Sequence, residues 1–203
     1  MRVDPEPGSA ATRDTRIEVQ PQARARGGPT LDVVVLLDAS ESMGAAWSAQ
    51  HTRWTAACEA ARAFLRAPGS NLRLVSIMIF AREAQLVAGP LASHKVQLPE
   101  LVPRGRAMTG TAVNAALAHL CQHATPASPQ AIVLLTDAAG EVAELRRAAE
   151  RAARLRVAVH ALVFAPEPDG ALAEAARATG GTSQVATSPP SFTLRYAPPE
   201  ATS

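Results

Sequence analysis

The stretch LDVVVLLDASESMG, at residues 31–44, consists of an apolar, strand-like run followed by polar residues. The apolar run at 33–37 is continuous rather than alternating, which is typical of a strand buried on both faces of a parallel sheet. Asp38, Ser40 and Ser42 then follow at every second position. The stretch therefore predicts a buried strand that ends in one carboxylate and two hydroxyl groups.

Strand-like and helix-like segments alternate along the rest of the chain. Further strand-like runs lie at 72–81, 85–91, 131–136, 157–164 and, as a short last strand, 182–186. Apolar residues recur at helical spacing between most of them, at 47–65, from Thr111 past Leu120, at 141–155 and at 170–179. Such alternation predicts a mostly parallel sheet with helices on both faces.

The link between the runs at 72–81 and 85–91 consists only of Arg-Glu-Ala. So short a link can only form a hairpin, because a parallel connection needs a crossover of about a dozen residues or more. The run at 85–91 is therefore expected to be an antiparallel edge strand. The predicted fold class is α/β, a doubly wound, mostly parallel sheet with one antiparallel edge strand.

Composition narrows the class of protein. The 203 residues fit one domain with tails, and 47% hydrophobic residues are enough to form a globular core. The net charge of +2 is too small to indicate nucleic-acid binding by itself. No apolar run reaches the length of about 18 residues that spans a membrane, and the N-terminus, without an apolar h-region, does not look like a secretory signal. Both cysteines fall inside predicted helices, which argues against a disulfide framework. A cytoplasmic location is expected.

The two ends of the chain differ from its middle. Residues 1–30 are rich in Pro, Gly and Arg and are expected to form a mostly disordered tail, in which 15–20 could be one short strand. Residues 188–203 carry four prolines, and their alternating segment 192–196 could be a short edge strand. The folded domain is expected to occupy 31–187.

The polar side chains at the strand ends predict a metal site. Asp38 and Asp137 each end a buried strand, and ligands of such sheets bind outside the carboxyl ends of the strands. Ser40 and Ser42 follow the first strand, and Thr111 opens a helix. Carboxylate and hydroxyl oxygens suit a hard cation, Mg²⁺ in particular, with Mn²⁺ or Ca²⁺ as alternatives. A carboxylate from outside would fill the incomplete ligand shell.

These residues resemble a known motif. DASES at 38–42, Thr111 in TGT and Asp137 in LLTDA look like the metal-ion-dependent adhesion site of von Willebrand factor type A domains, and the order of elements matches from about 31 to 187. The resemblance implies a Rossmann-like fold. It also implies that Ser40, Ser42 and Thr111 coordinate a metal directly or through water, and that Asp38 and Asp137 hold it directly or through ordered waters.

The chain departs from the family pattern at two positions. Thr109 stands where the family often has a first glycine before Gly110, and Ala138 stands where it often has glycine. Neither change removes a ligand, and Thr111 is preferred to Thr109 as the ligand because it lies at the predicted helix start. Residues in the loops around the motif are candidate contacts for a protein partner. They are Glu41, Met43, Arg104, Arg106 and Met108.

Several of these signals have plainer explanations. The Asp and Ser residues at 38–42 could simply be caps of a helix, without a role in metal binding. His119 and His123 lie four apart on one predicted helix, as a zinc pair would, but a packed or solvated pair is preferred because no third ligand has clear spacing. The arginines at 146–156 alternate with glutamates, which favours a solvated helix face over a surface for an acidic partner.

The predicted function is a metal-dependent, non-enzymatic protein-binding module. The resemblance to standalone bacterial domains of this type implies a subunit of a larger complex, linked to AAA+ ATPases, stress response or defence. Its partner would supply an Asp or Glu to the metal; membrane and nucleic acid are not expected. Two alternatives stay open: a structural subunit with a vestigial metal site, and a phosphohydrolase with Asp38 as nucleophile. The second usually requires another acid two residues on, where this chain has Ser40.

Overall fold

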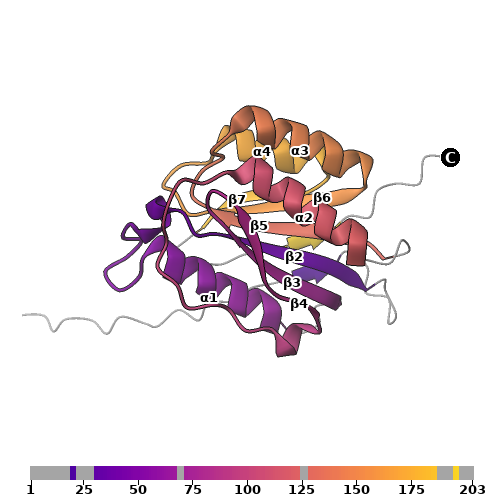
Figure 1. Ribbon diagram of the computed structural model, residues 1–203, viewed down its shortest axis with the longest axis horizontal. Coiled ribbons are helices and arrows are strands. Elements are labelled where there is room, and N and C mark those ends of the chain that lie inside the picture. Colours follow the sequence, from indigo (N-terminus) through magenta and orange to yellow (C-terminus); the bar gives the residue numbers. More distant parts are fainter. Residues whose placement is uncertain (1–18, 22–29, 68–70, 124–127, 187–193, 197–203) are drawn as a thin grey trace, which may run out of the picture.

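A computed structural model describes residues 19–21, 30–67, 71–123, 128–186 and 194–196 (Figure 1). Six strands form the main sheet in the order β4-β3-β2-β5-β6-β7, and only β3 and β4 pair antiparallel. The predicted fold class, with its antiparallel edge strand, is confirmed. The strands are β2 (Leu31–Asp38), β3 (Leu72–Phe80), β4 (Ala84–Leu91), β5 (Gln130–Thr136), β6 (Val157–Val163) and β7 (Ser183–Val185).

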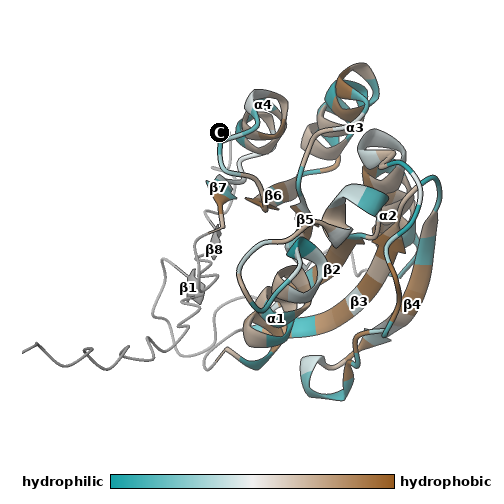
Figure 2. Cartoon of the chain, turned by 90° about the vertical axis from the view of Figure 1, so that its left-hand side faces the viewer, coloured by the Kyte–Doolittle hydropathy of each residue, from teal (hydrophilic) through white to brown (hydrophobic). Residues whose placement is uncertain are grey.

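Helices cover both faces of this sheet. Figure 2, which looks onto the carboxyl ends of the parallel strands, shows α1 on one face and α2, α3 and α4 on the other. The α-helices are α1 (Arg53–Arg66), α2 (Thr109–His123), α3 (Val142–Arg154) and α4 (Gly170–Ala178). Short 3-10 helices follow β2 and β4: η1 (Glu41–Gly44) and η2 (Ser93–Lys95).

The continuous apolar run of β2 serves two cores. Val33, Val35 and Leu37 belong to the core beneath α1, whereas Val34 and Leu36 belong to the core that α2, α3 and α4 cover. Successive side chains of a strand point to opposite faces of a sheet, so a strand between two helical layers is apolar at all of its central positions. This burial fixes the register of β2 and thereby the position of its polar end.

Helix α1 begins later than the apolar spacing predicts. Thr52 caps the helix, because its hydroxyl oxygen accepts a hydrogen bond from Thr55 N at 3.2 Å. Trp47 therefore lies before the helix rather than within it. Its ring still packs edge-on against Phe164, with the ring centroids 5.6 Å apart. A loop residue thus contributes to the core, and Arg53 becomes the first residue of α1.

Short strands near the two ends of the chain pair with each other. β1 (Val19–Pro21) and β8 (Leu194–Tyr196) form a separate, parallel two-stranded sheet, so β8 does not extend the main sheet as an edge strand. Most of the predicted disordered tail at 1–30 and of the segment 188–203 lies outside the described residues. Within the described part of the chain, no helix is both long and apolar enough to cross a membrane.

Candidate metal centre

The two predicted aspartates meet at the carboxyl edge of the sheet because β2 and β5 are parallel neighbours. Leu37 of β2 pairs with Leu135 of β5. Asp38 is the last residue of β2, and Asp137 directly follows Thr136, the last residue of β5. Both side chains are buried. The sheet therefore brings together two carboxylates that lie far apart in the sequence.

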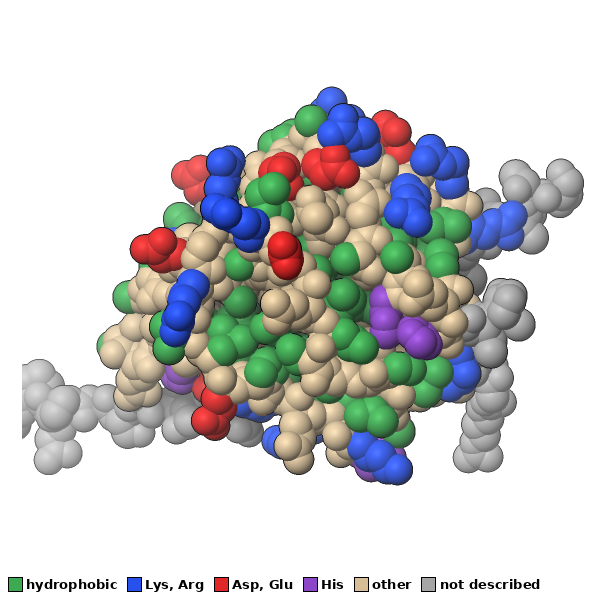
Figure 3. Space-filling model, viewed as in Figure 1, with side chains coloured by type: hydrophobic (Ala, Val, Ile, Leu, Met, Phe, Trp, Pro, Cys, Tyr) green, Lys and Arg blue, Asp and Glu red, His purple; other side chains and the backbone are tan. Residues whose placement is uncertain are grey.

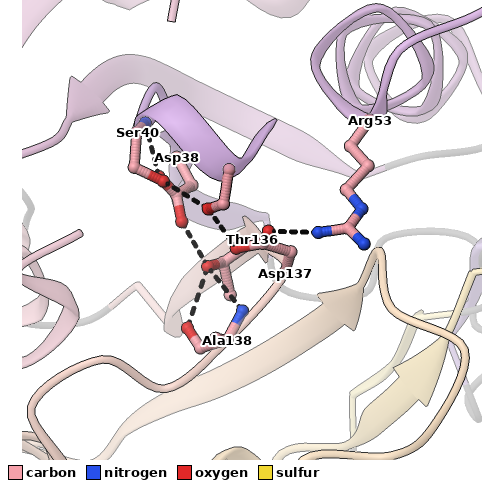
Figure 4. A network of polar contacts seen from close by, with 7 residues as sticks. Asp38, Ser40, Arg53, Thr136, Asp137 and Ala138 are labelled. Atoms are coloured by element: carbon pink, nitrogen blue, oxygen red, sulfur yellow. Dashed lines mark hydrogen bonds and ion pairs between the residues drawn. The ribbon is translucent and has the colours of Figure 1, made fainter. Parts of the chain in front are cut away.

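Asp38 is held by neutral donors. Ser40 N–H donates to its Oδ1 at 2.8 Å, and the Thr136 hydroxyl donates to its Oδ2 at 2.5 Å (Figure 4). Burial raises the pKa of Asp38, the hydrogen bonds from Thr136 and Ser40 act against this rise, and the charge of Asp137 adds to it. No Lys, Arg or His among the described residues forms an ion pair with Asp38. Its buried charge therefore lacks an internal counter-ion.

A chain of oxygen atoms connects the two serines to the second aspartate. Ser40 Oγ lies 3.1 Å from Ser42 Oγ, and the Ser42 hydroxyl donates to Asp137 Oδ1 at 3.0 Å. Neighbouring ligands of an octahedral Mg²⁺, each about 2.1 Å from the ion, lie about 3.0 Å apart. The spacing and chemistry of these oxygens fit Mg²⁺ or Mn²⁺. Four of the five predicted ligands, Asp38, Ser40, Ser42 and Asp137, are thus in one network.

The fifth predicted ligand, Thr111, has a different partner. It is exposed in the first turn of α2, and its hydroxyl donates to Glu141 Oε2 at 3.4 Å. Thr109, the alternative, is buried, begins α2 and donates to the carbonyl oxygen of Ala138 at 3.4 Å. Within the described residues, neither hydroxyl bonds to the other four predicted ligands. The choice of Thr111 over Thr109 stays a prediction.

Two residues of the network were not predicted as site residues. Thr136 precedes Asp137 in the motif, and its position at the end of a buried strand could have indicated it. Arg53 is the other: its Nη1 lies 2.6 Å from Asp137 Oδ2. Arg53 and Asp137 are 84 positions apart, and the sequence around Arg53 carries no sign of this contact.

The predicted partner contacts divide into a surface group and a buried residue. Glu41, Arg104 and Arg106 are exposed, and Met108 is partly buried. Met43 has no exposed surface and belongs to the core beneath α1, so its prediction as a surface contact is wrong. The reason is η1, which turns this side chain inward while leaving its neighbours in solvent.

The loops that carry these residues are joined by their backbones. Glu41 N–H donates to the carbonyl oxygen of Gly105 at 2.8 Å, and Arg104 N–H donates to the carbonyl oxygen of Ala39 at 2.7 Å. The loop after β2 and the segment before α2 therefore form one surface beside the two aspartates. The exposed charged side chains of these loops lie on this surface.

Side chains that bind softer metals do not gather in the described residues. Cys58 is buried and Cys121 exposed, and both are free thiols. The rings of His119 and His123 lie 4.5 Å apart, but His119 Nε2 is 2.8 Å from Ser76 Oγ, and burial lowers the pKa of His119. Among the residues that the structure describes, no group of three or more His, Cys, Asp or Glu side chains could hold a metal. The packed pair remains the preferred interpretation of the two histidines.

Ion pairs on α3 satisfy much of its arginine-rich surface. Arg147 pairs with Glu144 of the same helix, and Arg146 lies 3.4 Å from Glu174 of α4. Figure 3 shows basic and acidic side chains side by side at the top of the molecule. These contacts favour the solvated helix face over a basic patch for an acidic partner.

The fold is that of the von Willebrand factor type A domain. That family's model matches residues 33–140, more than half of the chain, and the chain belongs to the family. Domains of this family are known for protein–protein interaction. No curated protein matches the chain.

Solved structures share the fold at low sequence identity. An aerotolerance-related membrane protein from Bacteroides fragilis NCTC 9343, with multiple mutations to serine, has a TM-score of 0.61 and 19% identity over 78% of this chain and 92% of that one. The VWA domain of SpRpn10 has a TM-score of 0.56 and 17% identity over 85% and 90%. The N-terminal domain of TFIIH p34 has a TM-score of 0.55 and 19% identity over 79% and 92%. At these identities, the likeness shows the fold alone.

Proposed function

We propose that this domain is a metal-dependent, non-enzymatic protein-interaction module, in which Mg²⁺ at the ends of β2 and β5 binds an acidic residue of a partner protein. One observation carries the proposal. The oxygens of Ser40, Ser42 and Asp137 follow one another at about 3 Å, the spacing of neighbouring ligands around Mg²⁺, beside a buried Asp38 without a counter-ion. A dication would balance the two carboxylates.

Each residue of the network has a distinct task in this proposal. The Ser40 and Ser42 hydroxyls and the Asp137 carboxylate would hold the ion. Asp38 anchors the loop through Ser40 N–H and contributes charge directly or through water. Thr136 orients Asp38 from the neighbouring strand. The metal, when bound, supplies an electrophilic position that either water or a carboxylate can fill.

The surface around the site would select the partner. Arg104 and Arg106 are exposed basic residues, which suits an acidic residue within an acidic surrounding, and exposed Glu41 would disfavour some of those partners. Charged residues at the rim of an interface mainly affect association rate and specificity. Membership of a larger complex linked to AAA+ ATPases, stress response or defence, and a cytoplasmic location, also stay predictions.

A structural subunit with a vestigial metal site is the second candidate, and the Arg53–Asp137 ion pair favours it. An arginine on a ligand carboxylate supplies positive charge without a metal. The phosphohydrolase alternative has less support, because Asp38 is fully buried and both its oxygens accept hydrogen bonds. Such a carboxylate is poorly placed to attack a substrate.

Thermal denaturation with added Mg²⁺ tests the proposal, followed by partner capture in Mg²⁺ and in EDTA. We expect Mg²⁺ to raise the melting temperature of the parent protein, because only the folded chain gathers the ligands. Asp38→Ala should remove this rise, and Asp137→Ala should lose a partner that the parent retains only in Mg²⁺. Identical melting with and without Mg²⁺, together with equal capture in EDTA, would contradict the proposal and favour the structural subunit.

A further inference from the structure

The cation closest to the candidate metal site belongs to the protein itself. Arg53 reaches from the first turn of α1 to Asp137, and Figure 4 shows its guanidinium directed at that carboxylate. The Asp137 side chain is 4% exposed and that of Arg53 is 25% exposed. The ion pair is therefore largely shielded from water. Charges in such a shielded position interact more strongly than charges at an open surface.

Among the described residues, Asp137 is the one partner of the charged end of Arg53. Its Nε is buried and has no hydrogen-bond partner in the described structure. The start of α1 does not depend on the guanidinium, because Arg53 N–H donates to the carbonyl oxygen of Ala45 at 2.9 Å and Thr52 caps the helix. The guanidinium can therefore leave Asp137 without dismantling the helix start.

Arg53 and a divalent cation would share one carboxylate. Asp137 Oδ1 accepts from Ser42 and is the end of the oxygen chain, while Oδ2 contacts Arg53. Asp38 and Asp137 together would neutralise a dication, so a guanidinium that remains in contact leaves a surplus positive charge. Like charges a few ångströms apart repel strongly in a partly buried site.

We propose that Arg53 is an internal counter-cation of this site, which neutralises Asp137 in the metal-free protein and competes with the divalent ion for it. This inference rests on the proposed metal-dependent function. Arg53 then determines how much divalent ion the site requires. Metal binding weakens the Arg53–Asp137 contact and leaves the guanidinium free at the entrance, where it can pair with the acidic residue of the partner.

Calorimetric titration with Mn²⁺ alone tests the competition in the 203-residue chain. Arg53→Gln removes the charge, and Arg53→Met repeats the test with an apolar side chain. We expect both variants to bind Mn²⁺ at least about tenfold more tightly than the parent, given the contact distance and partial exposure of the pair. Their melting temperatures should also rise more on addition of Mn²⁺.

Arg62→Gln is the matched control. It removes the same charge from the same helix, about 13 Å further along its axis. That distance exceeds the Debye length of about 8 Å at physiological salt. We expect its Mn²⁺ affinity to stay within about twofold of the parent's, because charges at that separation are largely screened.

The outcomes separate this inference from the proposed function. Unchanged or weaker Mn²⁺ binding by folded Arg53→Gln and Arg53→Met would overturn the inference, and would leave the function intact if the parent binds Mn²⁺ and Asp38→Ala does not. Binding by the Arg53 variants but not by the parent would support the inference and contradict a metal-dependent function. Absence of binding in every protein would overturn both.

Discussion

Strand β2 carries a buried aspartate near each of its ends, and the two aspartates have different partners. Asp32, near its amino end, forms an ion pair with Arg73 of the neighbouring strand β3. Asp38, at its carboxyl end, accepts hydrogen bonds from Ser40 N–H and the Thr136 hydroxyl, and it has no ion pair among the described residues. The first charge is compensated within the sheet, whereas the second is left with neutral donors beside another carboxylate.

The difference separates a structural acid from one available to a ligand. A buried charge is costly unless it is paired, and Arg73 supplies that pairing for Asp32. At the other end of the strand, no ion pair among the described residues compensates Asp38, and Arg53 contacts Asp137 instead. On the proposed function, burial alone does not mark an aspartate as a metal ligand, whereas burial without a counter-ion among the described residues does.

The largest expected difference between the two aspartates is in metal affinity. Asp38→Asn should weaken Mn²⁺ binding by about 100-fold or more, because it removes one of the two charges that balance the ion. Asp32→Asn should leave the affinity within about twofold, since Asp32 lies at the opposite end of the strand. Calorimetric titration of both variants measures this. Equal losses would mean that the site does not lie at the carboxyl edge.

The stabilities of these variants must be compared at one pH, because the protonation of His160 makes the free energy of unfolding depend on pH. This histidine is fully buried, and burial lowers its pKa to about 4. The unfolded chain therefore takes up a proton between about pH 6.5 and pH 4 that the folded chain does not. Stability is intact above about pH 6.5 and should fall by up to about 3 kcal/mol as the pH approaches 4.

Urea denaturation across this range checks the effect, with His160→Gln as the comparison. Glutamine keeps an acceptor for Thr182 N–H, which donates to His160 Nδ1 at 3.2 Å. The variant should lose less stability on acidification than the parent. Some loss should remain, because the pKa of His119 is also lowered by burial. Parallel pH profiles of parent and variant would show that His160 is not the responsible group.

A smaller difference is expected in stability without metal. In EDTA at pH 7.5, Asp32→Asn should lower the free energy of unfolding by about 2 kcal/mol, since Arg73 loses its counter-ion but is exposed enough to reach water. Asp38→Asn should cost less than about 1 kcal/mol, because removing an unpaired buried charge offsets a lost hydrogen bond. Urea denaturation tests this order, and the reverse order would break the comparison between the two ends.

The smallest effects concern the two threonines of α2. Thr111 is exposed, so Thr111→Ala should change the free energy of unfolding by less than about 0.5 kcal/mol. Thr109 is buried, and Thr109→Ala should cost about 1 kcal/mol. Only the threonine that contacts the ion should also lower Mn²⁺ affinity, by severalfold. If Thr109→Ala weakens Mn²⁺ binding and Thr111→Ala does not, Thr109 takes the place of Thr111 in the predicted ligand set.

The sheet and the meeting of the two aspartates at its edge could be predicted because they depend on local patterns. A continuous apolar run followed by Asp38 places that acid at a strand end, and the same holds for Asp137. The three-residue link before β4 likewise determines an antiparallel edge. Those features require only strand polarity and sheet order.

What could not be predicted depends on individual side chains. Met43 turns inward because η1 follows β2, and Trp47 lies outside α1 because Thr52 caps it. Arg53 meets Asp137 only because the capped helix begins beside the end of β5. No spacing within the sequence reports a contact between residues so far apart.

Anomalous diffraction from crystals grown in Mn²⁺ tests the central claim most directly. We predict one strong peak at the carboxyl edge of the sheet, about 2.2 Å from the oxygens of Ser40, Ser42 and Asp137, with Arg53 withdrawn from Asp137. No peak at this position at saturating Mn²⁺, with the Arg53–Asp137 ion pair intact, would contradict the account.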